Sequence, residues 1–249
     1  MASVRLEEDY RPRIYERYAS GFQNAGPCFD AAAAARWGSA YAHYLRNWLP
    51  ASSGAAIVDL ASGGGRLLHF LRARGYSSVT GVDVSPEQAA LCRQVTDSVF
   101  EEDVREFLGR HGDSFDLITG LDLIEHFRKS EVLPFLDACH GALRAGGRLV
   151  LQTPNADSPW SSSVRYGDFT HEVAFNPTVL ARLLNLCGFT SVEYREVGPV
   201  LLRGGAASFL RGLAWKSIRA AMAAWNLVET GDAGSGVLTR VFLISALKA

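Results

Sequence analysis

Four aspartates are the residues of this 249-residue chain best placed to do chemistry, because each ends or closely follows a short apolar run. They are Asp59, Asp83, Asp103 and Asp122. In open α/β sheets, ligands bind at the carboxyl ends of the strands. Four carboxylates at successive run ends therefore predict one acidic ligand site along that edge.

The first aspartate opens a small-residue turn, Asp59 to Gly65, which precedes a stretch that we expect to be helical. Glycines let the backbone approach a ligand, and a helix N-terminus offers free N–H groups. A dinucleotide would place its pyrophosphate against Asp59. Two like charges about 4 Å apart cost roughly 1 kcal/mol in water and about 4 kcal/mol near a protein surface. The turn therefore favours a cationic ligand.

The turn resembles motif I of the class I S-adenosylmethionine-dependent methyltransferases, which usually has the pattern acid-x-Gly-x-Gly-x-Gly. S-adenosylmethionine carries a sulfonium and an amino group and no phosphate, so it suits the charge argument. Ala61 replaces the first glycine, and we expect that exchange to be mild if its φ stays negative. The resemblance implies cofactor contacts at Ser62, Gly63 and Gly65, and S-adenosylhomocysteine as the product.

The resemblance also gives roles to the second and third acids. Asp83 would accept hydrogen bonds from the two ribose hydroxyls, with Val84 beside it. Asp103 would meet the adenine amino group, and the backbone N–H of Val104 would meet a ring nitrogen. Glu102, one residue earlier, is the alternative candidate for that role.

The fourth acid begins Asp122-Leu123-Ile124-Glu125-His126, which resembles small-molecule methyltransferases at this position. Leu121 and Asp122 would border the methionine part of the cofactor. We interpret His126 as structural, with catalysis as the alternative. No Asn-Pro-Pro-Tyr motif is present, which argues against N-methylation of nucleic acids. Asp122 has no obvious partner carboxylates at the later strand ends, so no metal is expected.

Alternating strand and helix patterns position these acids and predict an α/β fold with right-handed crossovers. Together with the resemblance they imply a Rossmann-like seven-stranded sheet, mostly parallel with an antiparallel strand 7, and helices on both faces. Ser85 and Pro86 predict a capped helix start. The expected strands are residues 57–60, 79–84, 99–100, 115–121, 148–153, 190–197 and 237–247.

Residues 1–53 form an N-terminal helical extension with expected helices at 11–22 and 31–48. The resemblance implies a lid that closes over the cofactor, with Tyr15, Tyr18 and Phe22 as candidate ligand contacts. Packing of the longer helix on the sheet is the alternative. Residues 54–249 would form the methyltransferase domain.

The segment 154–176 is too long for an ordinary connection and rich in aromatic and charged residues, so we expect it to bind the acceptor. His171 is the candidate general base, because a neutral histidine can accept a proton from a hydroxyl. Trp160 and Tyr166 could stack on the acceptor, and Arg165 could hold an anionic group. Packing of the loop is the alternative for each. Residues 166–172 loosely resemble methyltransferases of bacterial surface-polysaccharide synthesis.

A second insertion, residues 199–235, contains an amphipathic basic helix at 203–228. Its apolar stripe could pack on the domain or on a second copy in a homodimer. It could also make a peripheral membrane contact or cover the acceptor site.

Composition limits the partners and the cellular compartment that we expect. The net charge of −1 predicts no nucleic-acid partner, and four scattered cysteines with no apolar leader predict a cytoplasmic protein with reduced thiols. The main hypothesis is methyl transfer from S-adenosylmethionine to a hydroxyl of a small molecule or glycan by direct SN2 displacement. The alternatives are N- or C-methylation, a non-catalytic interaction protein of the same fold, and a NAD-dependent oxidoreductase.

Overall fold

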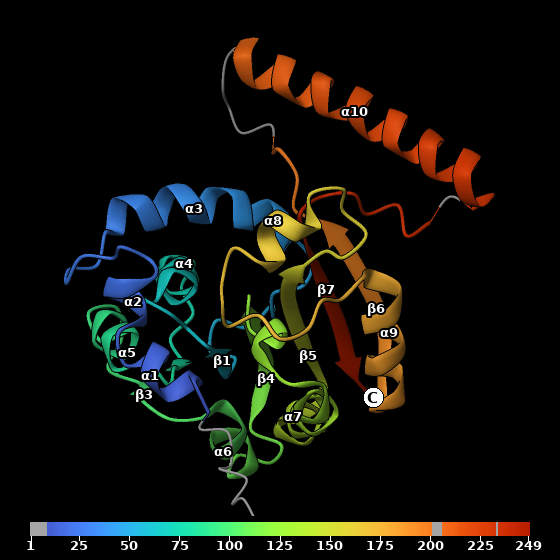
Figure 1. Cartoon of the computed structure of the whole chain (residues 1–249). Coiled ribbons are helices and arrows are strands. Elements are labelled where there is room, and N and C mark those ends of the chain that lie inside the picture. The colour runs from blue at the N-terminus through green and yellow to red at the C-terminus, as the bar shows by residue number, and fades with distance from the viewer. Residues whose placement is uncertain (1–8, 201–205, 233) are drawn as a thin grey trace, which may run out of the picture.

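The computed structural model describes residues 9–200, 206–232 and 234–249. A seven-stranded sheet has the order β3-β2-β1-β4-β5-β7-β6, and only β7 runs antiparallel to its neighbours (Figure 1). This confirms the predicted Rossmann-like fold. The strands are β1 Ile57–Leu60, β2 Val79–Val82, β3 Val99–Phe100, β4 Phe115–Leu121, β5 Leu143–Pro154, β6 Phe189–Glu196 and β7 Val241–Lys248.

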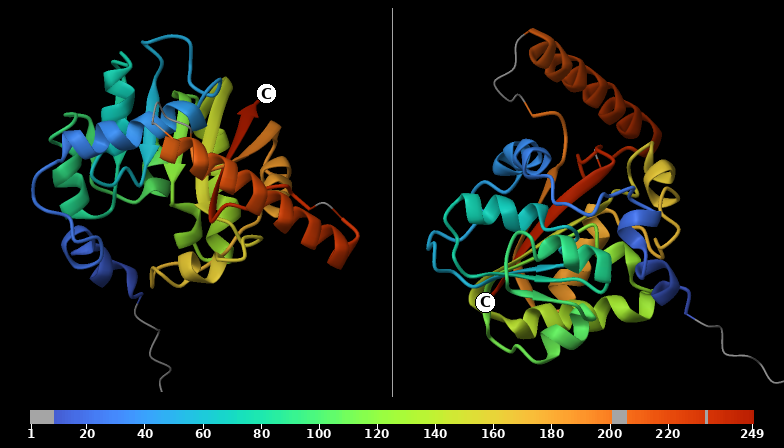
Figure 2. Two further views of the ribbon diagram at one scale, coloured as in Figure 1. Left: turned by 90° about the horizontal axis from the view of Figure 1, so that it is seen from above. Right: turned by 90° about the vertical axis from the view of Figure 1, so that its left-hand side faces the viewer.

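Helices cover both faces of the sheet, as predicted (Figures 1 and 2). Alternate residues of the central strands enter two separate cores. Val58 and Ile118 pack in the core that includes α6, α7 and α9, whereas Ile57 and Leu117 pack in the core that includes α3 and α4. The helices are α1 Arg11–Tyr15, α2 Tyr18–Gly21, α3 Ala31–Tyr44, α4 Arg66–Ala73, α5 Pro86–Cys92, α6 Val104–Gly109, η1 Ile124–His126, α7 Lys129–Ala142, α8 Ser161–Arg165, α9 Pro177–Leu186 and α10 Ala206–Thr230.

Several elements differ from their expected bounds. Among the strands, β2 ends two residues early at Val82 and β7 begins four residues late at Val241. The helix expected over residues 11–22 is split into α1 and α2, because Arg17 lies outside the helical region at φ −130° and ψ 39°. The helix expected over 31–48 ends at Tyr44. Strand β5 begins at Leu143, five residues early, and the irregular pairing between Phe115 and Leu117 accommodates that extension.

Helix α10 lies outside the layers that cover the sheet (Figures 1 and 2). Arg219 holds it to the body through an ion pair of 3.0 Å with Glu196. Leu210, Leu213 and Trp225 of the expected apolar stripe are exposed instead of packed on the domain. Residues 203–205 of the predicted helix lie outside the described residues. A membrane or a second copy as the partner of this surface stays a prediction.

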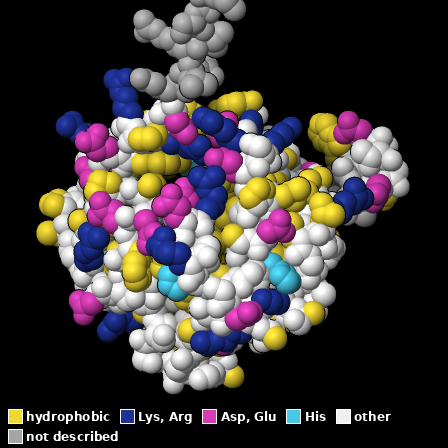
Figure 3. Space-filling model, turned by 90° about the horizontal axis from the view of Figure 1, so that it is seen from below, with side chains coloured by type: hydrophobic (Ala, Val, Ile, Leu, Met, Phe, Trp, Pro, Cys, Tyr) yellow, Lys and Arg dark blue, Asp and Glu magenta, His cyan; other side chains and the backbone are white. Residues whose placement is uncertain are grey.

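Two surface properties bear on partners. Within the described part of the chain, no helix combines the length and apolar character that a membrane crossing needs. On the face shown in Figure 3, basic side chains lie among acidic ones rather than gathering into one strip. The four cysteines are all free thiols.

Candidate functional site

An open cleft of about 1250 Å³ runs along the carboxyl edge of the sheet. It brings together nearly all of the cofactor contacts predicted from the sequence. Gly65 does not line the cleft: it is the N-cap of α4 at φ 86°, where a side chain would press against Cys92 and Val95. The predicted residues that do line it are Asp59, Ala61, Ser62, Gly63, Asp83, Val84, Asp103, Val104, Leu121 and Asp122.

The glycine-rich turn leaves β1 through a left-handed residue. Ala61 has φ 51°, so the condition under which its exchange for glycine is mild is not met. A left-handed conformation costs an L-residue roughly 1–2 kcal/mol. Gly63, at φ 52°, is left-handed as well, which suits glycine. The turn therefore carries strain at a residue that borders the cleft.

Asp59 is buried under this turn and accepts a 2.7 Å hydrogen bond from the hydroxyl of Thr119. Burial, reinforced by the nearby negative charge of Asp83, raises the pKa of Asp59 to about 7. A cation in the cleft would offset that penalty and favour the ionised form. The site thus suits a sulfonium or ammonium group.

Asp83 is held at the end of β2 by two backbone donors. The N–H of Gly63 donates to Oδ2 at 2.8 Å, and the N–H of Ser85 donates to Oδ1 at 2.9 Å. Burial nevertheless raises the pKa of Asp83 to about 6. Ser85 occupies the N-cap position of α5 but its side chain makes no capping bond, contrary to expectation. Its buried hydroxyl has no partner among the described residues, which leaves it available to a ligand.

Asp103 is the N-cap of α6 and forms an ion pair of 2.8 Å with Arg105. Burial is the largest single influence on the pKa of Asp103 and raises it. The hydrogen bonds and the charge of Arg105 together outweigh burial, so the pKa is lowered. Glu102, the alternative candidate, pairs with Arg110 and does not line the cleft. The geometry therefore favours Asp103 over Glu102 as the residue that faces an adenine.

Asp122 joins the cofactor end of the cleft to the N-terminal helices. Both of its carboxylate oxygens lie 2.9 Å from Nε2 of Gln152, whose Oε1 accepts a 2.5 Å hydrogen bond from Tyr41. Asp122 itself is left-handed at φ 55°. A side chain on α3 thus helps to fix a strand-end acid more than eighty residues further along the chain.

The N-terminal segment forms a wall of the cleft and is tied to the acceptor side. Tyr18 donates a hydrogen bond to Asp168, and Tyr10 donates one of 2.7 Å to Glu172. Tyr15 and Tyr18 line the cleft, whereas Phe22 is half exposed and does not. This arrangement is compatible with a lid, which remains a proposal.

The three predicted acceptor contacts on α8 and its flanks do not line the cleft. Trp160 and Tyr166 are exposed, the latter at 77%. Arg165 donates to the backbone carbonyl of Glu172 at 3.1 Å and lies beside the Tyr166 ring. The short helix α8 turns these side chains away from the cleft. Their contact with an acceptor stays a prediction.

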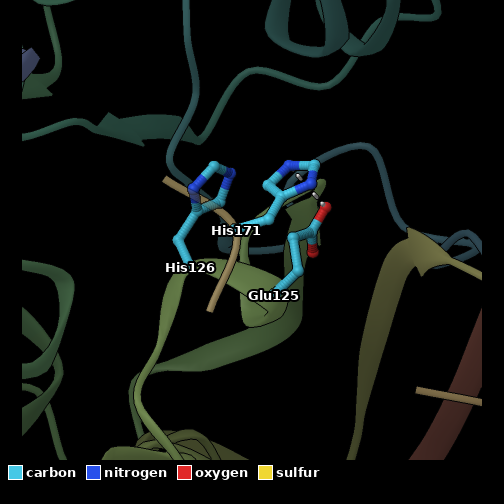
Figure 4. A group of neighbouring side chains, drawn as sticks. All are labelled: Glu125, His126 and His171. Atoms are coloured by element: carbon cyan, nitrogen blue, oxygen red, sulfur yellow. Dashed lines mark ion pairs between the residues drawn. The ribbon is translucent and has the colours of Figure 1, made fainter. Parts of the chain in front are cut away.

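His171 does line the cleft, at the end where Glu125 and His126 also lie (Figure 4). Its Nε2 is 4.0 Å from the Glu125 carboxylate, and its ring centroid is 4.8 Å from that of His126. Burial and the neighbouring His171 lower the pKa of His126 to about 4, so that its ring is neutral. Burial and Asp122 raise the pKa of Glu125 well above its usual range.

Sequence reasoning missed several residues of the cleft. Trp37 and Tyr41 of α3 carry no role in the sequence prediction, yet they line the cleft and stack on each other. Gln88 was not considered, although it lines the cleft beside the glycine turn. The aromatic spacing on α3 was a signal for the first two, but nothing in the sequence separates a cleft-facing stripe from a core-facing one.

Comparisons with known proteins support the resemblance to methyltransferases that the sequence indicated. A family model described as a methyltransferase domain matches residues 32–194, more than half of the chain. A ubiquinone biosynthesis O-methyltransferase of Xylella fastidiosa is 31% identical over 118 residues, 45% of this chain and 46% of that protein. The chain thus spans about half the length of the curated relatives it matches.

Solved structures share the fold at low identity. An S-adenosylmethionine-dependent methyltransferase of Archaeoglobus fulgidus superposes with a TM-score of 0.64 at 18% identity, over 96% of this chain and all of that one. The 1,6-didemethyltoxoflavin N1-methyltransferase of Burkholderia thailandensis, with bound S-adenosylhomocysteine, gives 0.55 at 20% identity, over 100% of this chain and 93% of that one. The acidic cleft and the family match agree: the chain belongs to the class I S-adenosylmethionine-dependent methyltransferases, and S-adenosylmethionine is its cofactor.

Proposed function

We propose that the protein transfers a methyl group from S-adenosylmethionine to a hydroxyl of a small molecule or glycan. The acceptor oxygen attacks the methyl carbon in line with the breaking S–C bond. The products are the methyl ether, S-adenosylhomocysteine and one proton. The relatives named as O-methyltransferases support this choice of atom, although they cover only part of the chain.

The observation that carries the proposal is the orientation of His171. Its Nδ1 lies 3.1 Å from the backbone carbonyl of Arg165, which can only accept a hydrogen bond. Nδ1 therefore carries the proton of the neutral ring, and Nε2 keeps a lone pair in the cleft. A hydroxyl needs such an acceptor, because it must lose its proton during transfer.

The acids at the other end of the cleft would place the cofactor. Asp83 would hold the ribose, Asp103 would face the adenine, and Asp59 with Asp122 would face the cationic part. Most of the rate enhancement would come from holding the hydroxyl oxygen and the methyl carbon in line.

Product analysis tests the proposal. The protein is incubated with S-adenosylmethionine carrying a ¹³C-labelled methyl group and with matched acceptors, such as a phenol and the corresponding aniline. The proposal expects the label at the methoxy position, with equimolar S-adenosylhomocysteine. Label on nitrogen or carbon would replace it with the N- or C-methylation alternative. No turnover with any acceptor would favour a non-catalytic role.

The charge and cysteine content lead us to place this activity in the cytoplasm and to expect no nucleic-acid partner. The family match leaves no support for the oxidoreductase alternative.

A further inference from the structure

Three side chains at the acceptor end of the cleft bring potential metal-ligand atoms close to one another. Glu125 and His126 come from η1, and His171 comes from the loop after α8 (Figure 4). One potential ligand atom from each lies within 4.8 Å of the other two. The three residues border the same cleft as the cofactor acids.

The hydrogen bonds of His126 fix which ring nitrogen is free. The hydroxyl of Thr170 has one proton, and it lies 2.6 Å from the Asp168 carboxylate, which can only accept. The Thr170 oxygen must therefore accept from Nδ1 of His126, at 2.8 Å. Nε2 of the neutral ring is left with a lone pair. In Figure 4, one ring nitrogen of His126 is turned toward His171.

His171 and Glu125 add two more acceptors to the same space. Nδ1 of His171 donates to the Arg165 carbonyl, so its Nε2 keeps a lone pair, and this atom lies 4.0 Å from the Glu125 carboxylate. Glu125 is only 1% exposed, and neither of its carboxylate oxygens has a hydrogen-bond partner among the described residues. A buried carboxylate without a partner is costly, so the carboxyl keeps its proton unless a cation replaces it, and a metal ion would supply that charge.

We propose that Glu125, His126 and His171 bind a divalent first-row transition-metal ion. Two imidazole nitrogens and one carboxylate suit zinc, iron or manganese better than magnesium or calcium. Metal bonds of about 2.1 Å would draw the ligand atoms together to about 3–3.4 Å. The bonds from Nδ1 of the two histidines to Thr170 and to Arg165 are of the kind that orients metal-bound imidazoles.

Three protein ligands leave coordination positions open toward the cleft. An acceptor hydroxyl that binds there becomes more acidic, because the cation stabilises its conjugate base. Its proton then passes to water, the oxygen attacks the methyl carbon, and the sulfonium leaves as S-adenosylhomocysteine. This extension rests on the proposed hydroxyl transfer and assigns His171 as a ligand whenever the ion is bound.

Cobalt(II) binding to the full chain tests the site directly. The protein is stripped with a chelator and titrated with Co²⁺ while the visible ligand-field absorption is recorded. The proposal expects one equivalent of Co²⁺ with saturable absorption, displaced by Zn²⁺. Glu125→Gln and His171→Gln should each weaken binding at least about tenfold, since each removes one of three ligands. His43→Gln, at an exposed histidine of α3 away from the cleft, should leave it unchanged.

Cofactor affinity, measured by calorimetry on the same samples, shows whether each variant is folded. If wild type takes up no stoichiometric Co²⁺, or if Glu125→Gln binds as wild type does while keeping cofactor affinity, the metal site is overturned. The proposed hydroxyl transfer would survive that result. Conversely, stoichiometric Co²⁺ with methyl transfer only to nitrogen would uphold the site and refute the hydroxyl proposal.

Discussion

The two ends of the cleft are built in different ways. At the cofactor end the acids are held by neighbouring strands and by the turns that leave them: Asp59 accepts from Thr119 on the adjacent strand, and Asp83 accepts from the backbone of Gly63 and Ser85. At the acceptor end the contacts join loops and short helices: Tyr18 contacts Asp168 across 150 residues, and His126 contacts Thr170 across 44. The cofactor end follows from the strand order, whereas the acceptor end depends on how the loops lie.

We therefore expect cofactor binding and methyl transfer to depend on different ends of the cleft. At the cofactor end, acids at strand ends would hold the cationic ligand. The acceptor end holds the lone pairs of two histidines on a short helix and a loop. Changes at the cofactor end should therefore alter affinity for the cofactor, and changes at the acceptor end should alter turnover.

The largest effect is expected from Asp83→Ala. It removes the carboxylate that Gly63 and Ser85 hold at the end of β2 and that would bind both ribose hydroxyls. Affinity for S-adenosylmethionine, measured by calorimetry, should fall about 100-fold, equivalent to about 2.7 kcal/mol. Glu102→Ala, outside the cleft, is the matched control. Equal affinities in the two variants would reject the assignment of the cofactor end.

His171→Gln should reduce turnover about a hundredfold, because it removes the lone pair that serves the acceptor hydroxyl. Affinity for S-adenosylmethionine should stay within about twofold, since the residue lies at the other end. Steady-state rates of S-adenosylhomocysteine formation provide the measurement. A variant with full turnover would leave His171 without a chemical role.

Asp59→Asn should remove part of the pH dependence of cofactor binding. The pKa of Asp59 is raised from 3.8 to about 7, so wild-type affinity for the sulfonium should rise as the carboxyl ionises between about pH 6 and 8. In the absence of cofactor, the stability of the fold depends on pH with the opposite sign. The native state holds this proton more tightly than the unfolded state, so stability falls as pH rises from about 4 to 7. Calorimetry and thermal melts over this range should show both trends flattened in the variant.

Ala61→Gly should stabilise the chain slightly. It relieves a left-handed alanine at φ 51°, a gain of about 1 kcal/mol before the entropy of glycine is counted. For a domain of this size that corresponds to a rise in Tm of about 2–4 °C at most. A lower Tm in differential scanning calorimetry would mean that the Ala61 methyl group makes a packing contact worth more than the strain.

Trp160→Ala should have the smallest effect, because the side chain is half exposed and lies outside the cleft. We expect kcat/KM to change by less than about twofold, which matches a surface substitution. A tenfold loss would show that the loop bearing α8 closes over the acceptor, and would restore the stacking role predicted from the sequence.

The sequence was sufficient to predict the sheet and the convergence of the strand-end acids on one cleft. Asp59, Asp83 and Asp103 each follow a short apolar run, so their convergence needed only the strand order. The backbone angles of the glycine-rich turn could not be predicted from the sequence. Ala61 is left-handed, which its residue type disfavours, because the geometry of the turn prevails over the local preference.

The acceptor end could be predicted only in part. His171 was identified by its chemistry, but its partners Glu125 and His126 lie more than forty residues away and meet it through the path of a loop. The exposure of Trp160 and Tyr166 could not be predicted, because aromatic character does not say which way a side chain points, and α8 sets that direction. The expectation of no metal rested only on carboxylates at strand ends, and the proximity of two histidines from a short helix and a loop is not visible in the sequence.

The most direct test of the division between the two ends is a paired measurement on Asp83→Asn and His171→Gln. Cofactor affinity is determined by calorimetry, and the rate of methyl transfer is determined in a single turnover at saturating S-adenosylmethionine. The account predicts that the first variant loses affinity but approaches the wild-type rate at saturation, and that the second keeps affinity but loses rate. If both variants lose affinity and rate together, the two ends are not separable and the account is contradicted.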